Sequence, residues 1–425
     1  MIVNIEKNIA RGKITAPSSK SMAHRLLICA AMCDGVSTVS GISDCEDVSA
    51  TIDCLSALGI KTEKIGNVIK VEGRNFRDVK PTAPLMCRES GSTLRFLIPA
   101  AMLSGQSTVF YGAGRLMQRP MSVYERLFEE KKLTYISDGT SIVVRGPLES
   151  GEYSLVGNVS SQFISGLIFA LPLADGESVI KITPPVESRS YINLTVNAVR
   201  SFGISLEWVD EYTLKIPGNQ SYKPTDVTVE GDYSGAAFPD SLNLFGGEVE
   251  ISGLDPNSIQ GDSVYKKYFD MLNIGAPTIY IGDCPDLGPI LFAIAAAKYG
   301  GVFSGTRRLK IKESDRAEAM ATELKKFGAS VSVYDDAVVV YPTSFHAPDE
   351  ILSGHNDHRI VMALSILLTL TGGEIAGAEA ISKSYPAFFE NLKELGIKVC
   401  EYEKIHGRLL QGSYSNCKNK RSNVE

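Results

Sequence analysis

The sequence predicts an α/β fold built from six βαβαββ-like units, three in each half of the chain. Two observations support this prediction. An apolar segment of helical length, a Gly turn and a short strand recur along the 425 residues, and in most copies a second helix and a pair of strands follow. The copies recur about every 70 residues, and the fourth is shorter than the others.

The first helix of each unit is apolar and runs directly into a Gly turn and a strand rich in Val, Ile, Thr or Ser. The six copies are residues 25–41, 95–112, 166–182, 235–253, 288–305 and 359–377. In the first copy, RLLICAAM precedes the turn CDG and the strand VSTVSG. This order predicts a helix that packs against the strand that follows it.

The second helix of a unit ends at a glycine, as in TIDCLSALGI, NLTVNAVRSFGI and FFENLKELGI. Glycine directly after the last periodic residue is typical of a helix C-terminus. Strand pairs follow, for example SVSVYDDAVVVYP. The fourth unit opens near VEGDYSG, so the two halves are expected to meet around residues 223–232.

Composition restricts the class of protein. Hydrophobic residues make up 44% and charged residues 22%, which is ordinary for a globular chain, and the net charge of −6 argues against a general nucleic-acid binder. The N-terminal segment lacks the apolar core of a signal peptide, and no apolar run reaches the ~18 residues of a membrane span. We therefore expect a cytoplasmic protein without nucleic-acid or membrane partners.

Metal binding has one weak candidate. His355 and His358 flank an Asp in HNDHR, but no HExxH, CxxC pair or third clustered ligand accompanies them. We expect instead that Asp357 and His358 orient Arg359, and that the protein uses neither a metal nor a cofactor.

Small and basic residues gather at the starts of four apolar helices: APSSKSMAHRLL, CRESGSTLRFL, NVSSQFISGL and SGHNDHRIVMAL. Free N–H groups at a helix N-terminus bind phosphate or carboxylate oxygens, and Lys and Arg add charge. A Ser at one helix start is usually only a cap. Four such segments in repeat-related positions indicate a shared anion-binding cleft.

Further cations lie outside these four segments. They are Arg119 in LMQRPM, Lys383 in SKSYPAFF, and Lys312 and Arg316 in RRLKIKESDRAEAM. Taken alone, the last segment is better explained as a solvated charged stretch.

The ordered set KSxxxR, GSTLR, QRP, SSQF, KESDR, DHR and KSYP resembles the 5-enolpyruvylshikimate-3-phosphate synthase family, over essentially the whole chain to about residue 410. The resemblance implies an inside-out α/β barrel fold in two domains, each of three repeats with helices packed inside strands. Residues 19–230 would form one domain. Residues 1–18 and 231–425 would form the other, with a frayed tail after about residue 412 and the active site in the cleft between the domains.

The resemblance also implies an activity, the transfer of the enolpyruvyl group of phosphoenolpyruvate to the 5-hydroxyl of shikimate 3-phosphate with release of phosphate. Its two substrates are the only partners that we expect, and we expect a monomer. The positions that match the family's shikimate 3-phosphate site are Lys20, Ser21, Arg25, Ser160, Ser161, Ser188, Asp286 and Lys312. Those that match its phosphoenolpyruvate site are Lys20, Gly91, Arg119, Gln162, Arg316, Arg359 and Lys383.

Three of the matching residues are implied to be catalytic. Asp286 matches the carboxylate that handles the proton of the 5-hydroxyl, and Glu313 matches a second carboxylate, implicated in proton transfer to the methylene carbon. Lys20 touches both substrates. The reaction needs an acid and a base that exchange roles, which two carboxylates and a lysine supply.

The chain departs from the family pattern at two places. Glu89-Ser90-Gly91-Ser92 stands where the family often has Asn-Ala-Gly-Thr, and Arg308 stands at the family's usual Asn. Two alternative functions remain open. One is enolpyruvyl transfer to a UDP-N-acetylglucosamine acceptor, which usually has Lys-Asn at the first motif and a loop Cys. The other is a non-catalytic polyanion-binding relative.

Overall fold

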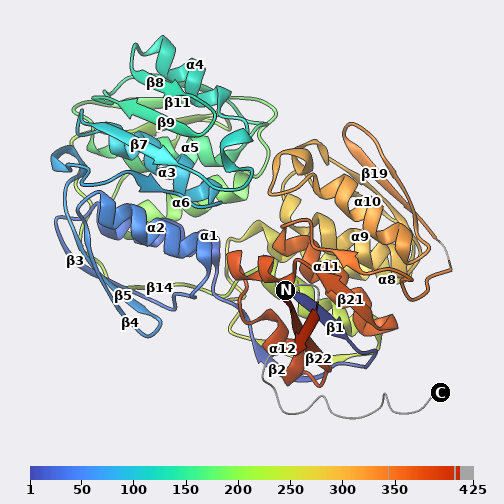
Figure 1. Cartoon of the computed structure of the whole chain (residues 1–425). Helices are drawn as coiled ribbons and strands as arrows, with labels where there is room; N and C mark the ends of the chain where they lie inside the picture. Colours follow the sequence, from blue (N-terminus) through green and yellow to red (C-terminus); the bar gives the residue numbers. More distant parts are fainter. Residues whose placement is uncertain (343, 406–407, 412–425) are drawn as a thin grey trace, which may run out of the picture.

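The computed structural model of the chain describes residues 1–342, 344–405 and 408–411. The chain forms two lobes, one coloured blue to green in Figure 1 and the other yellow to red, and the N-terminal strand lies in the latter. We call the lobe whose core spans residues 22–229 the first lobe, and the lobe whose core is drawn from residues 3–14 and 233–399 the second lobe. The tail after about residue 412 lies outside the described residues.

The first lobe contains six helices among the described residues. They are α1 (Lys20–Ala31), α2 (Glu46–Ala57), α3 (Gly91–Met102), α4 (Ser122–Glu130), α5 (Ser161–Ala170) and α6 (Arg189–Ser201). Its strands are β3 (Gly35–Ser40), β4 (Lys61–Ile65), β5 (Val68–Gly73), β6 (Leu85–Met86), β7 (Ser107–Tyr111), β8 (Thr134–Ser137), β9 (Ser141–Arg145), β10 (Glu152–Val156), β11 (Ser178–Thr183), β12 (Glu207–Trp208), β13 (Thr213–Ile216) and β14 (Val227–Thr228).

The second lobe has helices of the same kind. They are α7 (Tyr233–Asp240), α8 (Tyr265–Ile274), α9 (Gly288–Ala297), α10 (Arg316–Lys326), α11 (His358–Thr371) and α12 (Phe388–Glu394). Its strands are β1 (Ile2–Ile5), β2 (Arg11–Thr15), β15 (Glu248–Ser252), β16 (Thr278–Tyr280), β17 (Gly301–Ser304), β18 (Ser330–Val333), β19 (Ala337–Tyr341), β20 (Leu352–Ser353), β21 (Gly373–Ala376), β22 (Val399–Ile405) and β23 (Arg408–Gln411).

One sheet pattern repeats in both lobes. The orders β6-β7-β9-β8, β10-β11-β13-β12 and β16-β17-β19-β18 each pair the first two strands in parallel and the rest antiparallel. The parallel step needs a crossover, which the first helix of each unit provides. This is the βαβαββ unit that the sequence predicts.

Distant parts of the chain complete three of the units. β14 pairs in parallel with β3 and so closes the first lobe, while β2 pairs with β15 in a two-stranded sheet that is the shortened fourth unit. β1 joins β21 and β22 in the last sheet. The N-terminal strands therefore belong to the second lobe, and on this basis we infer the division into two domains.

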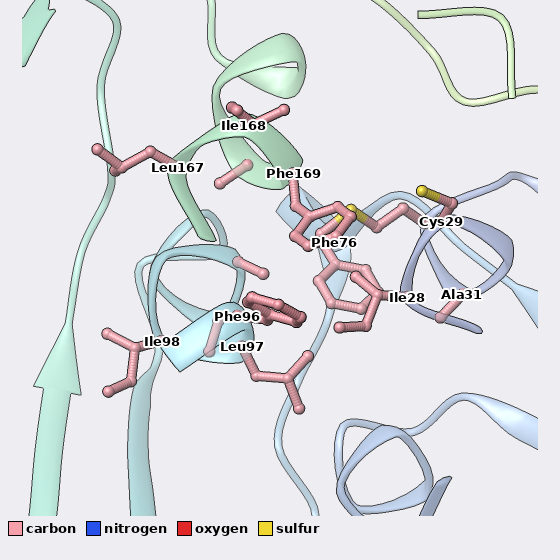
Figure 2. Close-up of a cluster of buried hydrophobic side chains, with 14 of the residues drawn as sticks. Ile28, Cys29, Ala31, Phe76, Phe96, Leu97, Ile98, Leu167, Ile168 and Phe169 are labelled. Carbon is pink, nitrogen blue, oxygen red and sulfur yellow. The ribbon is translucent and has the colours of Figure 1, made fainter. Parts of the chain in front are cut away.

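Helices fill the interior of each lobe because several of them are apolar on all sides. Helix α9 reads GPILFAIAAA and is buried along nearly its whole length. In the first lobe, Phe96 of α3 meets Phe169 of α5 edge to face, with ring centroids 5.3 Å apart (Figure 2). The sheets lie outside these helices, so the predicted fold class, with helices inside strands, is confirmed.

Candidate active site

A cavity lies between the two lobes, and most of the predicted site residues line it. The first lobe contributes Lys20, Ser21, Arg25, Gly91, Arg119, Ser160, Ser161, Gln162 and Ser188. The second lobe contributes Asp286, Lys312, Glu313 and Arg316. Residues from both halves of the sequence thus converge on one cavity, as the anion-binding motifs predict.

The four predicted segments do begin helices. Lys20 begins α1, Gly91 begins α3, Ser161 begins α5 and His358 begins α11. All four of these residues line the cavity, so the N-termini of four helices, with the positive ends of their dipoles, lie at the anion-binding region. The N-cap hydroxyl of Ser160 accepts from the backbone N–H of Gln162 and keeps its own proton for another acceptor.

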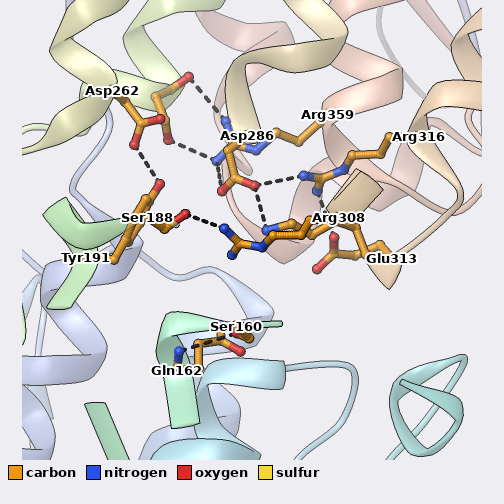
Figure 3. A network of polar contacts seen from close by, with 12 residues as sticks. Ser160, Gln162, Ser188, Tyr191, Asp262, Asp286, Arg308, Glu313, Arg316 and Arg359 are labelled. Atoms are coloured by element: carbon orange, nitrogen blue, oxygen red, sulfur yellow. Dashed lines mark hydrogen bonds and ion pairs between the residues drawn. The ribbon is translucent and has the colours of Figure 1, made fainter. Parts of the chain in front are cut away.

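Three cations surround Asp286. Its Oδ1 accepts from Arg316 at 2.8 Å and from Lys312 at 3.3 Å, and its Oδ2 accepts from Arg359 at 3.2 Å (Figure 3). Burial disfavours the charged carboxylate, but Lys312, Arg359 and Arg316 outweigh burial and hold the pKa of Asp286 well below its usual range. The carboxylate is therefore ionised.

Arg316 connects three carboxylates. Its guanidinium donates to Asp286 at 2.8 Å, to Glu313 at 2.7 Å and to Asp357 at 2.8 Å, and its side chain is 1% exposed. Arg119, from the first lobe, pairs with the other oxygen of Glu313 at 3.2 Å. Although burial opposes ionisation, Arg119 and Arg316 hold the pKa of Glu313 well below its usual range.

The two lysines in the cavity differ in their surroundings. Lys20 donates to Asp47 at 2.7 Å, and although burial opposes it, Asp47 and then Glu313 raise the pKa of Lys20. Burial lowers the pKa of Lys312 to about 8, because Asp286 compensates only part of the desolvation and Arg316 repels the ammonium. Lys20 is therefore protonated, whereas Lys312 can lose its proton near pH 8.

Ser188 and Arg308 form one wall of the cavity. Arg308 donates from Nη1 to the hydroxyl of Ser188 at 2.8 Å, and its Nε makes no hydrogen bond to the described residues. Glu187 lies 3.5 Å from the same guanidinium. Ser188 adopts φ 56° and ψ 41°, a left-handed conformation that turns the chain into α6. The departure at Arg308 therefore places an additional cation beside a predicted substrate hydroxyl.

Two predicted residues, Arg359 and Lys383, are not among the lining residues of the cavity. Arg359 reaches the cavity through Asp286. Lys383 is 5% exposed and donates to Glu89 at 3.0 Å and to the backbone carbonyl of Asn356 at 2.7 Å. Glu89, the other departure from the family pattern, therefore forms an ion pair across the two lobes with Lys383, a residue predicted to bind phosphoenolpyruvate.

The lining residues that were not predicted as site residues include Arg95, Tyr191 and Asp47. Arg95 belongs to the quoted motif GSTLR and donates to Gln162 at 2.8 Å. Tyr191 lies in the first turn of α6, three residues after the N-cap Ser188, so its nearness in sequence to a predicted site residue could have found it. No signal in the sequence points to Asp47, because its role depends on the distant Lys20.

The histidines of HNDHR do not share a site. His355 contacts Glu323 at 2.9 Å, and neither ring nitrogen of His358 makes a hydrogen bond to the described residues. Oδ1 of Asp357 accepts from the backbone N–H of Arg359 at 2.9 Å, and its Oδ2 accepts from Arg316. The guanidinium of Arg359 donates to Ser234 and Asp286, so no hydrogen bond connects it to His358. Within residues 1–342, 344–405 and 408–411, no cluster of His, Cys, Asp and Glu has the arrangement of a metal site.

Comparison with known proteins decides the family. Residues 5–392 match the model of the family EPSP synthase (3-phosphoshikimate 1-carboxyvinyltransferase). This chain belongs to the EPSP synthase family.

Similar proteins cover nearly all of the chain. The chain is 36% identical to the 3-phosphoshikimate 1-carboxyvinyltransferase of Clostridium kluyveri over 94% of its length and 98% of that protein. It is 38% identical to the protein of the same name from Clostridium perfringens strain SM101, over 91% of this chain and 96% of that one. The fold matches an EPSP synthase structure from Acinetobacter baumannii with a TM-score of 0.77 at 22% identity, over 94% of this chain and 100% of that chain. None of the helices described here is long and apolar enough to cross a membrane.

Proposed function

We propose that this chain transfers the enolpyruvyl group of phosphoenolpyruvate to the 5-hydroxyl of shikimate 3-phosphate. Membership of the EPSP synthase family supports the reaction, and one observation in the structure supports the site: Asp286 and Glu313 share the guanidinium of Arg316 at the edge of a cavity rich in cations. Both substrates carry several negative charges. A pocket that offers buried Lys and Arg side chains offsets their mutual repulsion.

The first chemical step is an addition. The 5-hydroxyl oxygen bonds to C2 of phosphoenolpyruvate while its proton passes to the Asp286 carboxylate, and C3 receives a proton from Glu313 or Lys20. The product is a tetrahedral ketal phosphate. Both carboxylates are weak bases while their cations hold them, since neighbouring cations stabilise the charged form. When substrate phosphate and carboxylate groups occupy these cations, the pKa of each carboxyl rises towards the range needed for proton transfer.

The second step is an elimination with the roles reversed. The group that protonated C3 removes a proton from it, the C2–O bond to phosphate breaks, and the double bond of the enol ether forms. Asp286 gives the proton that it took from the 5-hydroxyl to the departing phosphate oxygen and is ionised again. Inorganic phosphate and 5-enolpyruvylshikimate 3-phosphate leave. Two carboxylates on one guanidinium suit this exchange, because each can act once as acid and once as base.

We place the acceptor substrate beside Arg25, Ser160, Ser161, Ser188 and Lys312, and phosphoenolpyruvate beside Lys20, Arg119, Gln162 and Arg316. The hydroxyls and the start of α5 suit a phosphoester, and the convergent guanidinium groups suit a carboxylate and a phosphate. Arg359 and Lys383 are proposed phosphoenolpyruvate ligands that must exchange their present partners, Asp286 and Glu89, for the substrate.

The experiment is an assay of phosphate release from phosphoenolpyruvate. We expect release with shikimate 3-phosphate, none with UDP-N-acetylglucosamine, none without an acceptor, and no loss of activity in EDTA. Turnover with the UDP-sugar alone would assign the other transferase activity, and no turnover with either acceptor would favour the non-catalytic relative.

We also propose that the monomer is the catalytic unit, because one chain brings both proposed catalytic carboxylates and most of the proposed substrate ligands to the same cavity. Light scattering during size-exclusion chromatography tests this. A dimer at assay concentrations whose dilution abolishes activity would contradict it.

A further inference from the structure

Tyr191 in the wall of the cavity connects the two lobes. It lies in the first turn of α6 in the first lobe, and its hydroxyl donates to Oδ2 of Asp262 at 2.6 Å (Figure 3). Asp262 belongs to a short 3-10 helix, η5 (Gly261–Val264), in the second lobe. The position of this ring therefore depends on both lobes.

The first lobe packs against the ring of Tyr191 and binds its backbone. Its carbonyl accepts from Arg25 at 3.0 Å and from the hydroxyl of Thr195 at 3.2 Å. Arg25 is itself a proposed ligand of the acceptor substrate. The tip of the ring has Asp262 as the hydrogen-bond partner that fixes its direction.

The two lobes approach each other closely at this point. A Cβ added to Gly261 would lie 2.4 Å from the hydroxyl oxygen of Ser190, nearer than real Cβ atoms come to another heavy atom, so the contact depends on a glycine here. The neighbouring Ser188 donates its backbone N–H to Asp283 of the second lobe at 3.0 Å. The first turn of α6 is therefore a docking point between the lobes as well as a wall of the cavity.

Burying the carboxyl group of Asp262 at this contact lowers the stability of the fold. Asp262 is 4% exposed, and its Oδ1 has no hydrogen-bond partner among the described residues. Burial, and then repulsion by Asp286, raise the pKa of Asp262 to about 7, while Tyr191 and Arg359 oppose the shift. A buried polar oxygen without a partner destabilises the fold, so packing alone does not account for a carboxylate here.

We propose that Asp262 is a positioning residue for the acceptor substrate: when the lobes dock, it fixes the ring of Tyr191 against the pocket beside Ser188 and Arg25. The inference rests on the proposed function. Asp262 does not line the cavity, and we expect it to affect only the part of the site that binds the acceptor substrate. Phosphoenolpyruvate, which we place beside Arg119 and Arg316, does not depend on this ring.

A double-mutant cycle tests the proposal on the full chain. The variants are Asp262→Ala, Tyr191→Phe and the double variant, with Asp270→Ala and Tyr299→Phe as controls at exposed positions of the second lobe. We expect each single variant to raise KM for shikimate 3-phosphate roughly tenfold, the size of effect typical for a lost hydrogen bond to a charged group. KM for phosphoenolpyruvate should change less than about twofold. The double variant should match the single variants, because both remove the same contact.

Conservative replacement separates positioning from a structural role. Asp262→Asn keeps an oxygen that accepts from the Tyr191 hydroxyl, so it should restore most of the affinity lost in Asp262→Ala. Thermal unfolding identifies variants that are merely unstable. Additive effects of the two substitutions, or equal rises in both KM values, would overturn the proposal. A wild-type protein without turnover would contradict the proposed function instead, and the shift in melting temperature on adding shikimate 3-phosphate would then still report the contact.

Discussion

Asp286 and Glu313 bind the same guanidinium, since Arg316 donates to one at 2.8 Å and to the other at 2.7 Å. The two carboxylates are 27 positions apart in the sequence, yet Arg316 holds them on either side of one planar group. Each is ionised by its cations, and each gains basicity when substrate charges compete for those cations. We expect this arrangement to let the two carboxylates exchange the roles of acid and base in the proposed reaction.

Replacement of Asp286 tests its part in the addition step. We expect Asp286→Ala to lower kcat by at least ~10²-fold, the low end for losing a positioned base. The substitution leaves Lys312, Arg316 and Arg359 without this partner, so circular dichroism must show a folded protein. Asp335→Ala is the matched control at an exposed position, where we expect kcat to be unchanged. Wild-type turnover in folded Asp286→Ala protein would refute the assignment.

Glu313→Gln removes the charge of the second carboxylate but keeps its shape. We expect kcat to fall by at least ~10²-fold, because an amide can neither give nor take the C3 proton. Single-turnover exchange of the C3 hydrogens of phosphoenolpyruvate with solvent deuterium should slow as well. Glu318→Gln, five positions later on the exposed face of α10, serves as the control. Unchanged exchange in Glu313→Gln would assign the C3 proton to Lys20.

The low pKa of Lys312 predicts a pH dependence of acceptor binding. Its ordinary pKa of 10.5 falls to about 8 by burial, so the ammonium that attracts phosphate is present below pH 8 and is lost above it. KM for shikimate 3-phosphate should therefore rise as the pH increases through about 8. Lys312→Arg, which stays charged, should flatten this rise. Equal slopes in both proteins between pH 7 and pH 9.5 would exclude Lys312 as the cause.

The departure at Arg308 predicts an electrostatic effect on the acceptor side. Arg308→Asn restores the family's usual residue. It also removes the cation that lies 3.5 Å from the Glu187 carboxylate, and leaves that negative charge unpaired near the acceptor site. We expect KM for shikimate 3-phosphate to rise roughly tenfold, an energy in the range of one charged hydrogen bond. The double variant Arg308→Asn, Glu187→Gln should recover much of the loss, since it removes the repulsion. A double variant as weak as Arg308→Asn would mean that Arg308 contacts the substrate itself.

Much of this architecture is readable from the sequence because it is local. Apolar segments such as that of α9 identify buried helices, and Gly turns mark where strands begin. The cross-lobe contacts are not local. Nothing in the motif around Lys383 shows that Glu89 neutralises it, and Asp262 lies in a segment, QGDSV, with no charge pattern of its own. The sequence identifies the cations of the site and two of its acids, Asp286 and Glu313, but not that Glu89 of the first lobe binds Lys383 of the second.

The last prediction concerns movement of the two lobes. Among the residues that line the cavity, seven are Lys or Arg and three are Asp or Glu, so positive charges face one another across the boundary. Cross-lobe pairs such as Arg119–Glu313 at 3.2 Å offset only part of this repulsion. In solution the open form should therefore be populated, and an anionic substrate that contacts both lobes should favour closure. Closure would also exclude water from the reacting groups.

Small-angle X-ray scattering at fixed ionic strength measures this change. We expect the radius of gyration to fall when shikimate 3-phosphate is added, with movement at the crossings between the lobes near residues 17–20 and 223–232. Arg25→Ala should weaken the response because it removes a ligand of the acceptor. Arg145→Ala, at the exposed C-terminal end of β9, should not. High salt should reduce the difference between the open and closed forms, since it screens the repulsion. A radius that stays constant at saturating substrate would mean that the lobes are already docked, and that the substrates enter a preformed site.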